Sequence, residues 1–426
     1  MAVDGNSGIR TVFGFQFKKW KHDFLRQALP HLHFEFAPMY LSAEEFGREW
    51  EPKIKACESP AIFLWGIDRW GFYTQLAADL QMPIFFIEDG FIRSANPHAS
   101  QAIPLSLTID DVAPHFDWKR RTRLQRILSD YNFRTDEALL SRARAGIARL
   151  CENEISKYNG GVYRELPTYL NSSRKKVLVV GQVENDAAVM YGSKVAHTNN
   201  ELVRLAAKEN PEAEIIYRIH PDIIFRVREA RSRPEDVAHL CHIMAENIPI
   251  SKVLQCVDHV YTITSLVGFE ALIREKLVTV LGRPFYAGWG LTDDRQEGSE
   301  RPRKLGLIEL FAGAYLLYPR YFSRNGSPIE FEDALHLLES DLQGRTSETW
   351  KDPRPHIFSV AEWGLRSPLG LLGWRYLLRF ILDPYIKKVA SAEDLVEFRR
   401  DPGLFFAELQ SSRLRQIGRL LFPPER

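Results

Sequence analysis

The sequence is poor in cysteine and has no long apolar run. Four cysteines are scattered along 426 residues, and their spacings match neither a disulfide framework nor a CxxC pair, so we expect a reducing compartment. No apolar segment follows Met1, which argues against a secretory signal. No stretch approaches the roughly 18–20 apolar residues that a membrane-spanning helix needs. Together these absences predict a cytoplasmic protein.

An excess of charge of one sign is also missing. The chain has 56 Lys and Arg against 55 Asp and Glu, a formal net charge of +1. This balance creates no strong overall field, and we expect no nucleic-acid partner. The nearest candidate for a membrane segment, Leu371–Leu382, is interrupted by Arg375 and Arg379. It predicts contact with a membrane surface without crossing.

Several motifs of cofactor chemistry are absent as well. The sequence has no GxxxxGK[ST], which excludes P-loop chemistry, and no GxGxxG after a strand, which argues against NAD or FAD. The pair Asp293–Asp294 has the chemistry to hold Mg²⁺, but it does not directly follow a predicted strand. We therefore expect no metal. A group of histidines and cysteines fits no zinc spacing and is interpreted as structural: His239, Cys241, His242, Cys256 and His259.

What the sequence does contain is an alternation of short β-rich runs with helical patterns, which is typical of βαβ units. A polar, turn-rich stretch at Asn159–Lys176 divides this alternation into two halves. We predict an α/β fold with two Rossmann-like domains facing a central cleft, spanning residues 1–165 and 172–320, and a helical C-terminal extension over residues 321–426. The predicted strands are Thr11–Phe15, Ala61–Trp65, Pro83–Ile87, Lys176–Val180, Ala213–Ile219, His259–Ile263 and Leu277–Leu281.

Polar clusters follow four of these strands, where a doubly wound sheet binds its ligands. The clusters are Glu88–Ser94, Gly181–Asp186, His220–Asp222 and Thr264–Ser265. Because the carboxyl ends of parallel strands share one edge, we expect these side chains to form one site.

Thr264 and Ser265 precede a predicted helix, Leu266–Arg274. Their hydroxyls and the backbone N–H groups at the helix start are suited to a phosphate, although either residue alone also fits a simple helix cap. Glu270 on the same helix is a candidate ribose ligand. His220 offers an imidazole to a phosphate or leaving group, and a structural histidine is the alternative.

The acidic candidates are Glu88 and Asp186, at strand ends in different predicted domains. Transfer of a sugar needs one carboxylate at the anomeric carbon and usually a second group that handles the proton. A surface turn is the alternative for Glu88-Asp89-Gly90. In the glycine-rich loop Gly282–Gly290, aromatic rings could stack on a base or sugar, or simply pack the loop.

Taken together, these clusters resemble the bacterial capsule β-Kdo transferases of the KpsC type, in the capsule polysaccharide synthesis family. The resemblance covers roughly residues 10–320 and follows the family's order of motifs. The matching stretches are EDGFIRS (Glu88–Ser94), IPLSL (Ile103–Leu107), GQVENDA (Gly181–Ala187), IIYRIHPD (Ile215–Asp222), TITSLVGFEAL (Thr262–Leu272) and GRPFYAGWGLTDD (Gly282–Asp294).

This resemblance implies a GT-B fold and a retaining transfer of Kdo from CMP-β-Kdo to a glycan or glycolipid, without a metal. The N-terminal domain would face the acceptor and the second domain would bind the CMP-sugar. The implied catalytic residues are Asp186 as nucleophile, Glu88 as acid/base, and His220. The implied acceptor-side residues are Asp89 and Arg93. The implied donor-binding residues are Gln182, Arg218, His220, Pro221, Thr264, Ser265, Glu270, Tyr286 and Trp289.

Two departures from the family pattern limit this transfer of roles. Family members often carry two catalytic modules, whereas this chain has length for one, and the stretch Ala95–His98 lacks the usual glycine. The extension over residues 321–426 mixes Arg with Leu, Phe and Trp, which suits the inner membrane, a capsule assembly protein or packing across the domains. Other readings of the chain are a transferase for another nucleotide-sugar, a sugar-nucleotide epimerase or hydrolase, and an inactive scaffold module.

Overall fold

The structure is a computed structural model in which the chain divides into two compact units. Unit 1 comprises Met1–Phe85, Phe225–Glu229 and Lys351–Arg426, and unit 2 comprises Phe86–Ile224 and Ala230–Trp350. The described residues are 8–39, 41–95, 103–157, 159, 167–171, 173–224, 231–246, 248–298, 301–343, 378–389, 394–395, 398–399, 402–407, 409 and 412–422.

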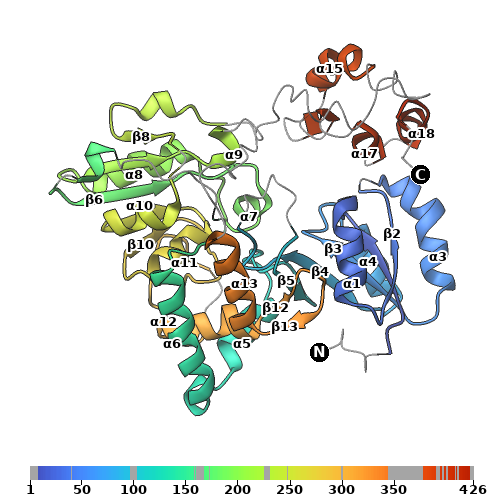
Figure 1. Ribbon diagram of the computed structural model, residues 1–426, viewed down its shortest axis with the longest axis horizontal. Coiled ribbons are helices and arrows are strands. Elements are labelled where there is room, and N and C mark those ends of the chain that lie inside the picture. The colour runs from blue at the N-terminus through green and yellow to red at the C-terminus, as the bar shows by residue number, and fades with distance from the viewer. Residues whose placement is uncertain are drawn as a thin grey trace. The chain divides into compact units, whose positions relative to one another are not determined.

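The described strands form two sheets, one of seven strands and one of six (Figure 1). The first sheet has the order β13-β12-β5-β4-β3-β1-β2 and the second the order β11-β10-β9-β6-β7-β8. The strands are β1 (Thr11–Phe15), β2 (His33–Phe36), β3 (Pro60–Trp65), β4 (Ile84–Asp89), β5 (Ser106–Asp110), β6 (Lys176–Val180), β7 (Glu214–Arg218), β8 (His242–Met244), β9 (His259–Thr262), β10 (Leu277–Val280), β11 (Asp293–Asp294), β12 (Pro319–Phe322) and β13 (Pro328–Ile329).

Helix length varies from three residues in α2 to sixteen in α6. Two π-helical segments, Phe46–Trp50 and Ala312–Leu317, continue into or out of α-helices. The α-helices are α1 (His22–Ala28), α2 (Ala43–Glu45), α3 (Glu51–Ala56), α4 (Phe72–Asp79), α5 (Arg123–Asp130), α6 (Glu137–Glu152), α7 (Ala187–Met190), α8 (Asn199–Glu209), α9 (Pro221–Ile224), α10 (Ile250–Cys256), α11 (Leu266–Leu272), α12 (Leu307–Phe311), α13 (Phe331–Gln343), α15 (Leu378–Val389), α17 (Pro402–Ala407) and α18 (Ser412–Leu421).

Unit 1 contains three parallel strands, with β1 between β2 and β3. The middle strand reads TVFGF and is almost entirely buried, as expected for a parallel strand covered on both faces. Gly14 leaves room for a neighbouring ring, because a Cβ there would lie 2.4 Å from the Phe36 side chain. The aromatic residues of this part of the chain therefore pack directly over the strands.

Within unit 2, antiparallel pairing joins four strands, β4, β5, β12 and β13. Strand β5 pairs antiparallel with β4, β12 with β5, and β13 with β12. In this register Pro319 lies opposite Thr108 and Tyr321 opposite Ser106. The chain thus returns from residue 319 to complete a sheet that begins near the N-terminus, a pairing that the sequence did not predict.

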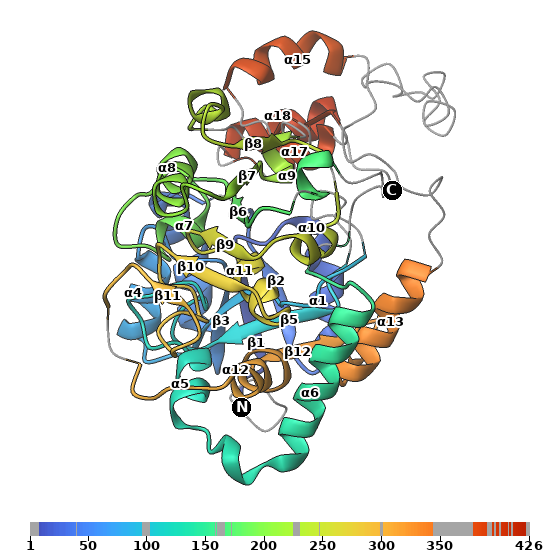
Figure 2. The ribbon, with the colours of Figure 1, turned by 90° about the vertical axis from the view of Figure 1, so that its left-hand side faces the viewer.

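The second sheet is wholly parallel, and its side chains alternate between two cores. Val177 and Val179 on β6 point into the core that includes Leu202 and Val203 of α8. Leu178 on the same strand joins the core built with α10 and α11. This period of two is what a β-strand with both faces covered requires. Helix α8 covers one face of the sheet, and α10 and α11 cover the other (Figure 2).

Helices α6, α12 and α13 close the larger core from outside the sheets. Leu150 of α6, Phe311 of α12 and Leu338 of α13 are each at most 2% exposed in the same cluster. An ion pair fixes the outer edges of α6 and α13, since Arg149 binds Glu339 at 2.7 Å. Apolar burial stabilises the contact between the two helices. The ion pair helps to fix their alignment along each other.

The expectation of an α/β fold with two Rossmann-like sheets is confirmed. The runs Thr11–Phe15 and Lys176–Val180 coincide with β1 and β6, and the other predicted strands are correct to within two residues at either end. The predicted linker at Asn159–Lys176 lies partly outside the described residues. The domain boundaries near residues 165 and 320 stay predictions.

The described part of the predicted C-terminal extension, residues 321–426, is mainly helical, but it also contains the end of β12 and the whole of β13. Helices α15, α17 and α18 pack around a small core of Phe398, Phe405, Phe406 and Phe422. Among the described residues, no helix combines the length and the apolarity that crossing a membrane requires. The apolar stretch Leu371–Leu382 lies largely outside the described residues.

Candidate active site

The loop between β9 and α11 is organised by one side chain from the neighbouring strand. Gln182 follows β6, is 7% exposed, and directs its Oε1 at the turn. That oxygen accepts backbone N–H groups from Ile263 (3.2 Å), Thr264 (2.9 Å) and Ser265 (3.1 Å). The Gln182 amide nitrogen donates to Thr264 Oγ1 at 3.0 Å. Gln182 thus holds the loop, and it occupies the N–H groups of residues 263–265 that the sequence offered to a phosphate.

Thr264 itself lies in a slot formed by glycine backbone. A Cβ added to Gly192 would lie 2.8 Å from the Thr264 methyl carbon, and one added to Gly282 would lie 2.6 Å from it. Gly181 is constrained in the same way, because its Cβ would lie 2.7 Å from the carbonyl oxygen of Arg218. The backbone around Gly181, Gly192 and Gly282 is therefore packed so closely that a side chain at any of the three would clash.

Ser265 is the N-cap of α11, and its Oγ accepts the backbone N–H of Val267 at 3.2 Å. The capping interpretation is correct for this residue. The Ser265 carbonyl accepts the hydroxyl of Tyr286, which lies against Gly268 with no room for a Cβ. Thr264 and Ser265 thus lie at the end of β9, as predicted. Their backbone N–H groups, however, already donate hydrogen bonds to Gln182.

His220 follows β7, which neighbours β6 in the sheet. Its side chain is about one third exposed, and Nδ1 accepts the backbone N–H of Asp222 at 3.1 Å. Because Nδ1 accepts, the neutral ring carries its proton on Nε2. His220 is therefore a hydrogen-bond donor through Nε2, as binding of a phosphate requires. Pro221 begins the short helix α9 directly after it.

A buried cluster of charges lies beside this edge. Arg218, at the end of β7, is 8% exposed, and burial lowers its pKa to about 10 while Glu270 acts against the shift. Its Nη1 is buried and has no hydrogen-bond partner among the described residues. Glu270 on α11 is 4% exposed, and burial raises its pKa. A buried guanidinium N–H without an acceptor is a donor to which an anion can bind.

Lys157 connects this cluster to the end of β4. Its backbone N–H donates to Glu270 Oε1 at 2.8 Å. Burial lowers the pKa of Lys157, and the carboxylates of Asp89, Glu88 and Glu270 counteract the effect. We call Glu88, Asp89, Arg93, Lys157, Arg218 and Glu270 the charge cluster.

Asp89 and Arg93 form a buried ion pair within the charge cluster. Arg93 is 0% exposed, and its Nε donates to Asp89 Oδ2 at 2.9 Å. Arg93 also donates to Ser94 Oγ at 3.0 Å. These residues were predicted on the acceptor side, and the structure encloses both of them. Glu88, the preceding residue, is partly exposed at the same strand end.

Asp186 lies at the N-terminus of α7. Its Oδ2 accepts the backbone N–H of Ala188 at 3.2 Å, and its side chain is partly exposed. The other acid of this motif, Glu184, is buried and accepts N–H groups from Asn199 (2.6 Å) and Ser232 (2.9 Å). Glu184 therefore has a structural role, because its carboxylate binds backbone N–H groups of the protein. Asp186 is the acid of this motif whose side chain reaches solvent.

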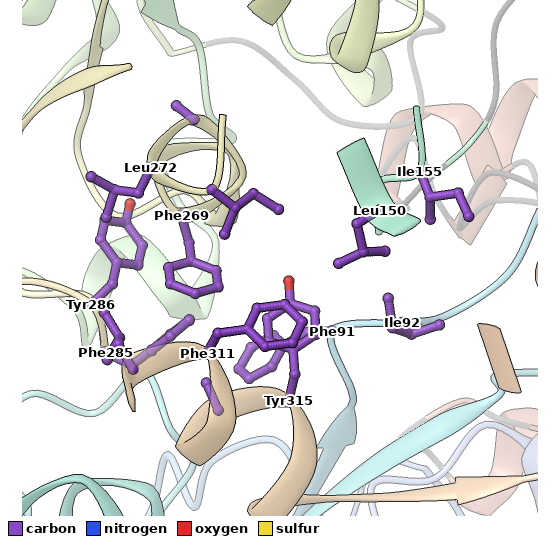
Figure 3. Packing of buried hydrophobic residues seen from close by; sticks show 14 of the residues in the cluster. Phe91, Ile92, Leu150, Ile155, Phe269, Leu272, Phe285, Tyr286, Phe311 and Tyr315 are labelled. Atoms are coloured by element: carbon purple, nitrogen blue, oxygen red, sulfur yellow. The ribbon is translucent and has the colours of Figure 1, made fainter. Parts of the chain in front are cut away.

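The prediction that Tyr286 and Trp289 stack on the donor is wrong in this structure. Both rings are 0% exposed. Figure 3 shows Tyr286 beside Phe285 and Phe269 in the core, and Trp289 donates its indole N–H to the Phe285 carbonyl at 2.7 Å. Tyr286 and Trp289 therefore pack the loop, since their rings are buried and their polar hydrogens are bonded within the protein. The alternative of a packed structural loop is correct.

Two residues near the site were not predicted from the sequence. Lys157 lies in a polar stretch with no motif around it. His115 lies among aromatic rings that include Phe91 and Phe285, and burial lowers its pKa to about 3, with Lys157 adding to the effect. These two residues come close to the site only in the folded chain. No motif or spacing in the sequence marks them.

Within the described residues, no group of three or more His, Cys, Asp or Glu side chains is placed to hold a metal ion. Asp293, considered for Mg²⁺, instead binds Arg295 at 2.6 Å and Thr279 at 3.0 Å. The arrangement offers donors for an anion, from Arg218 and His220, and two partly exposed carboxylates, Glu88 and Asp186. This set suits chemistry on an anionic sugar donor.

The chain is similar to known proteins of capsule polysaccharide and lipopolysaccharide biosynthesis. The profile of the family described as "Capsule polysaccharide biosynthesis protein" matches residues 118–321. The lipopolysaccharide-processing protein LpsZ of Rhizobium meliloti is 41% identical over 324 residues, which are 76% of this chain and 74% of LpsZ. The capsule polysaccharide modification protein LipA of Neisseria meningitidis serogroup B is 39% identical over 287 residues, so the chain spans only 40% of the length of LipA.

Two solved structures of KpsC from Thermosulfurimonas dismutans share the fold. One, described as a β-Kdo 2,4 transferase, has 29% sequence identity and a TM-score of 0.65, and the match covers 78% of this chain and 98% of that one. The other, described as a β-Kdo 2,7 transferase, has 30% identity and a TM-score of 0.62, with 78% and 99% covered. With the extensive similarity to LpsZ, these matches show that the chain belongs to the capsule polysaccharide biosynthesis protein family.

Proposed function

We propose that the protein is a retaining β-Kdo transferase that uses CMP-β-Kdo to extend a glycan or glycolipid of a bacterial surface polysaccharide. The observation that carries the proposal is the buried Nη1 of Arg218, which has no partner among the described residues and lies beside His220 in the chain. CMP-Kdo carries a phosphate and a carboxylate, and either group is an acceptor for such a donor. The similarity to two KpsC proteins described as β-Kdo transferases supports Kdo as the transferred sugar.

In this proposal the second sheet binds the nucleotide. His220 donates from Nε2 to the phosphate, and Arg218 neutralises the phosphate or the sugar carboxylate. Gln182 contributes indirectly, because it fixes the loop that carries Thr264 and Ser265. Glu270 contacts the ribose from α11. The proposal needs no metal, since the Arg218 guanidinium supplies positive charge and His220 supplies a hydrogen bond to the leaving phosphate.

Retention of configuration follows from two displacements at the anomeric carbon. Asp186 attacks that carbon with its carboxylate, the bond to the phosphate oxygen breaks, and CMP leaves. The acceptor hydroxyl then attacks the same carbon while Glu88 takes its proton, and the bond to Asp186 breaks. These two displacements require no oxidant or other co-reactant.

Binding of nucleotides tests the donor class directly. Calorimetric titration with CMP, in the presence of EDTA and with UMP and UDP as controls, should show binding of CMP alone. The affinity should fall in His220→Ala. Binding of UDP instead, or a need for metal, would assign the protein to another class of nucleotide-sugar enzyme.

The covalent step has its own test. Intact-mass measurement after incubation with CMP-β-Kdo alone should show an adduct of one Kdo, and Asp186→Ala should abolish it. An adduct that survives this substitution would remove Asp186 as nucleophile. Release of free Kdo at the rate of CMP formation, with and without acceptor, would favour a hydrolase.

The site of action in this proposal is the cytoplasmic face of the inner membrane. A growing glycolipid is held there, and an enzyme that lies on the membrane surface meets it without extracting the lipid.

A further inference from the structure

The C-terminal helices expose an unusual share of the chain's apolar surface. Of the twelve large apolar residues that are exposed among the described residues, six lie on two helices. Those on α15 are Phe380, Ile381 and Tyr385, and those on α18 are Leu414, Ile417 and Leu420. Scattered apolar residues are normal on a protein surface, but a concentration on two short helices is not.

On α18 the exposed residues form a stripe. Leu414, Ile417 and Leu420 follow one another at intervals of three, so they lie along one side of the helix. They are 44%, 45% and 72% exposed. Gly418 lies on the buried side of α18, where an added Cβ would lie 2.0 Å from the Cβ of Phe406. The apolar face of α18 is therefore wider than the small core that it covers.

Helix α15 has the same two-sided pattern. Leu378, Leu382 and Ile386 recur every four residues and pack against the core of Phe398, Phe405, Phe406 and Phe422. Ile381 and Tyr385 lie on another side and are 63% and 66% exposed. On α15 the exposed apolar residues thus lie on a different side from those that pack against this core.

The charge of these helices identifies the surface that would cover the exposed side. Helix α18 contains Arg413, Arg415 and Arg419 and no Asp or Glu. Helix α15 contains three basic residues, and its one acid, Asp383, is engaged by Arg399 at 2.7 Å. A second copy of the chain would bring two cationic helices together, and their charges would repel.

We infer that α15 and α18 form a docking surface for an anionic lipid bilayer, with the apolar side chains entering the headgroup boundary and Arg413 binding lipid phosphate. Arg413 is exposed and precedes Ile417 and Leu420 by four and seven positions, so a cation lies on the same side of α18 as these apolar residues, as binding to an anionic membrane surface requires. The inference deepens the membrane-surface location in the proposed function. It does not depend on the sugar donor, so either can fail without the other.

Flotation of the full-length protein with vesicles tests the surface. We expect binding to vesicles that contain phosphatidylglycerol, weaker binding to phosphatidylcholine alone, and weakening with added salt. The triple variant Leu414→Asp, Ile417→Asp, Leu420→Asp should bind about tenfold or more weakly. Leu277→Asp is the control, because Leu277 is 63% exposed on β10, and it should bind as the parent does.

Circular dichroism and thermal unfolding would establish that the triple variant keeps the parent's fold, and the single variant Leu420→Asp extends the test if it does not. Equal binding of the parent and both α18 variants would overturn the inference, as would equal binding to neutral and anionic vesicles. A parent that ignores vesicles but forms a dimer, which Leu420→Asp disrupts, would assign the surface to a second copy and would also overturn it. None of these outcomes concerns binding of CMP, which is measured without lipid.

Discussion

Gln182 binds Thr264 at two points, accepting its backbone N–H at 2.9 Å and donating to its hydroxyl at 3.0 Å. The two residues are 82 positions apart in the sequence and lie at the ends of adjacent parallel strands. The side chain of one strand thus completes the turn of the next. A carboxamide suits this role, because it is both acceptor and donor.

Removal of this carboxamide should therefore damage both the loop and the site. In Gln182→Ala the buried backbone N–H groups of Ile263 and Thr264 lose their acceptor, whereas that of Ser265 keeps Thr262 Oγ1, and we expect a loss of about 2–4 kcal/mol in the free energy of unfolding. Affinity for CMP should fall as well. Urea denaturation and calorimetry measure the two effects. Gln75→Ala is the control, since Gln75 binds Asp79 on the exposed surface of α4; equal stability of the two variants would contradict this role of Gln182.

A methyl group at Gly282 should also be costly. Its Cβ would lie 2.8 Å from the Gly192 carbonyl oxygen and 3.0 Å from that of Ile263, and backbone atoms cannot move aside cheaply. We expect Gly282→Ala to lower the free energy of unfolding by about 1–3 kcal/mol. Gly47→Ala is matched, because the nearest atom there is 3.8 Å away in a helical segment, and it should gain about 0.5–1 kcal/mol. Thermal unfolding of both variants decides the matter, and a loss of similar size in each would count against the slot around Thr264.

Arg218 should be needed for ligand binding more than for folding. Arg218→Met removes a buried cation, whose pKa burial lowers to about 10, while buried Glu270 keeps Arg274 and Lys157 as charged neighbours, so we expect only a modest loss of stability. Binding of CMP or of CMP-β-Kdo should weaken about tenfold or more through loss of a charge-assisted hydrogen bond. Arg204→Met, on the exposed side of α8, should bind normally. Calorimetry gives the affinities, and undiminished affinity in Arg218→Met for both ligands would show that Nη1 has no anion to bind.

His115 should make the protein less stable in acid. Its pKa is about 3 in the folded state against 6.5 ordinarily, so between these values the unfolded chain binds a proton that the folded chain does not. The free energy of unfolding therefore rises with pH across this window and falls as the pH drops through it. In His115→Phe, the loss of stability between about pH 7 and about pH 5 should be smaller by about 1–2 kcal/mol. Urea denaturation at both pH values measures the difference, and parallel losses in parent and variant would mean that His115 titrates normally.

Much of the fold was predictable, because the buried strands are short runs of β-branched and aromatic residues between turns. Lys176–Val180 shows this directly, with four apolar residues after one lysine. Strand β12 escaped prediction because PRYF begins with a proline and its partner β5 is distant in the sequence. Local patterns do not contain such long-range pairings.

The candidate site was predictable in position but not in detail. Strand ends brought Gln182, His220 and Thr264 to one edge, as topology requires. The sequence could not tell whether Tyr286 faces a ligand or the core, since the same ring serves both purposes. Lys157 had no local signal at all, and its place beside Glu270 depends on how the chain continues after α6.

The pairing of β12 with β5 also sets an order of events at the ribosome. Strand β5 is synthesised before the entire second sheet, and its partner β12 emerges only afterwards. Until then the nascent chain has β5 with an open edge, the kind of edge that recruits foreign strands. A stop codon or a chimera junction placed before residue 319 would make that transient state permanent, so shortened versions of this protein should aggregate even when their second sheet is intact.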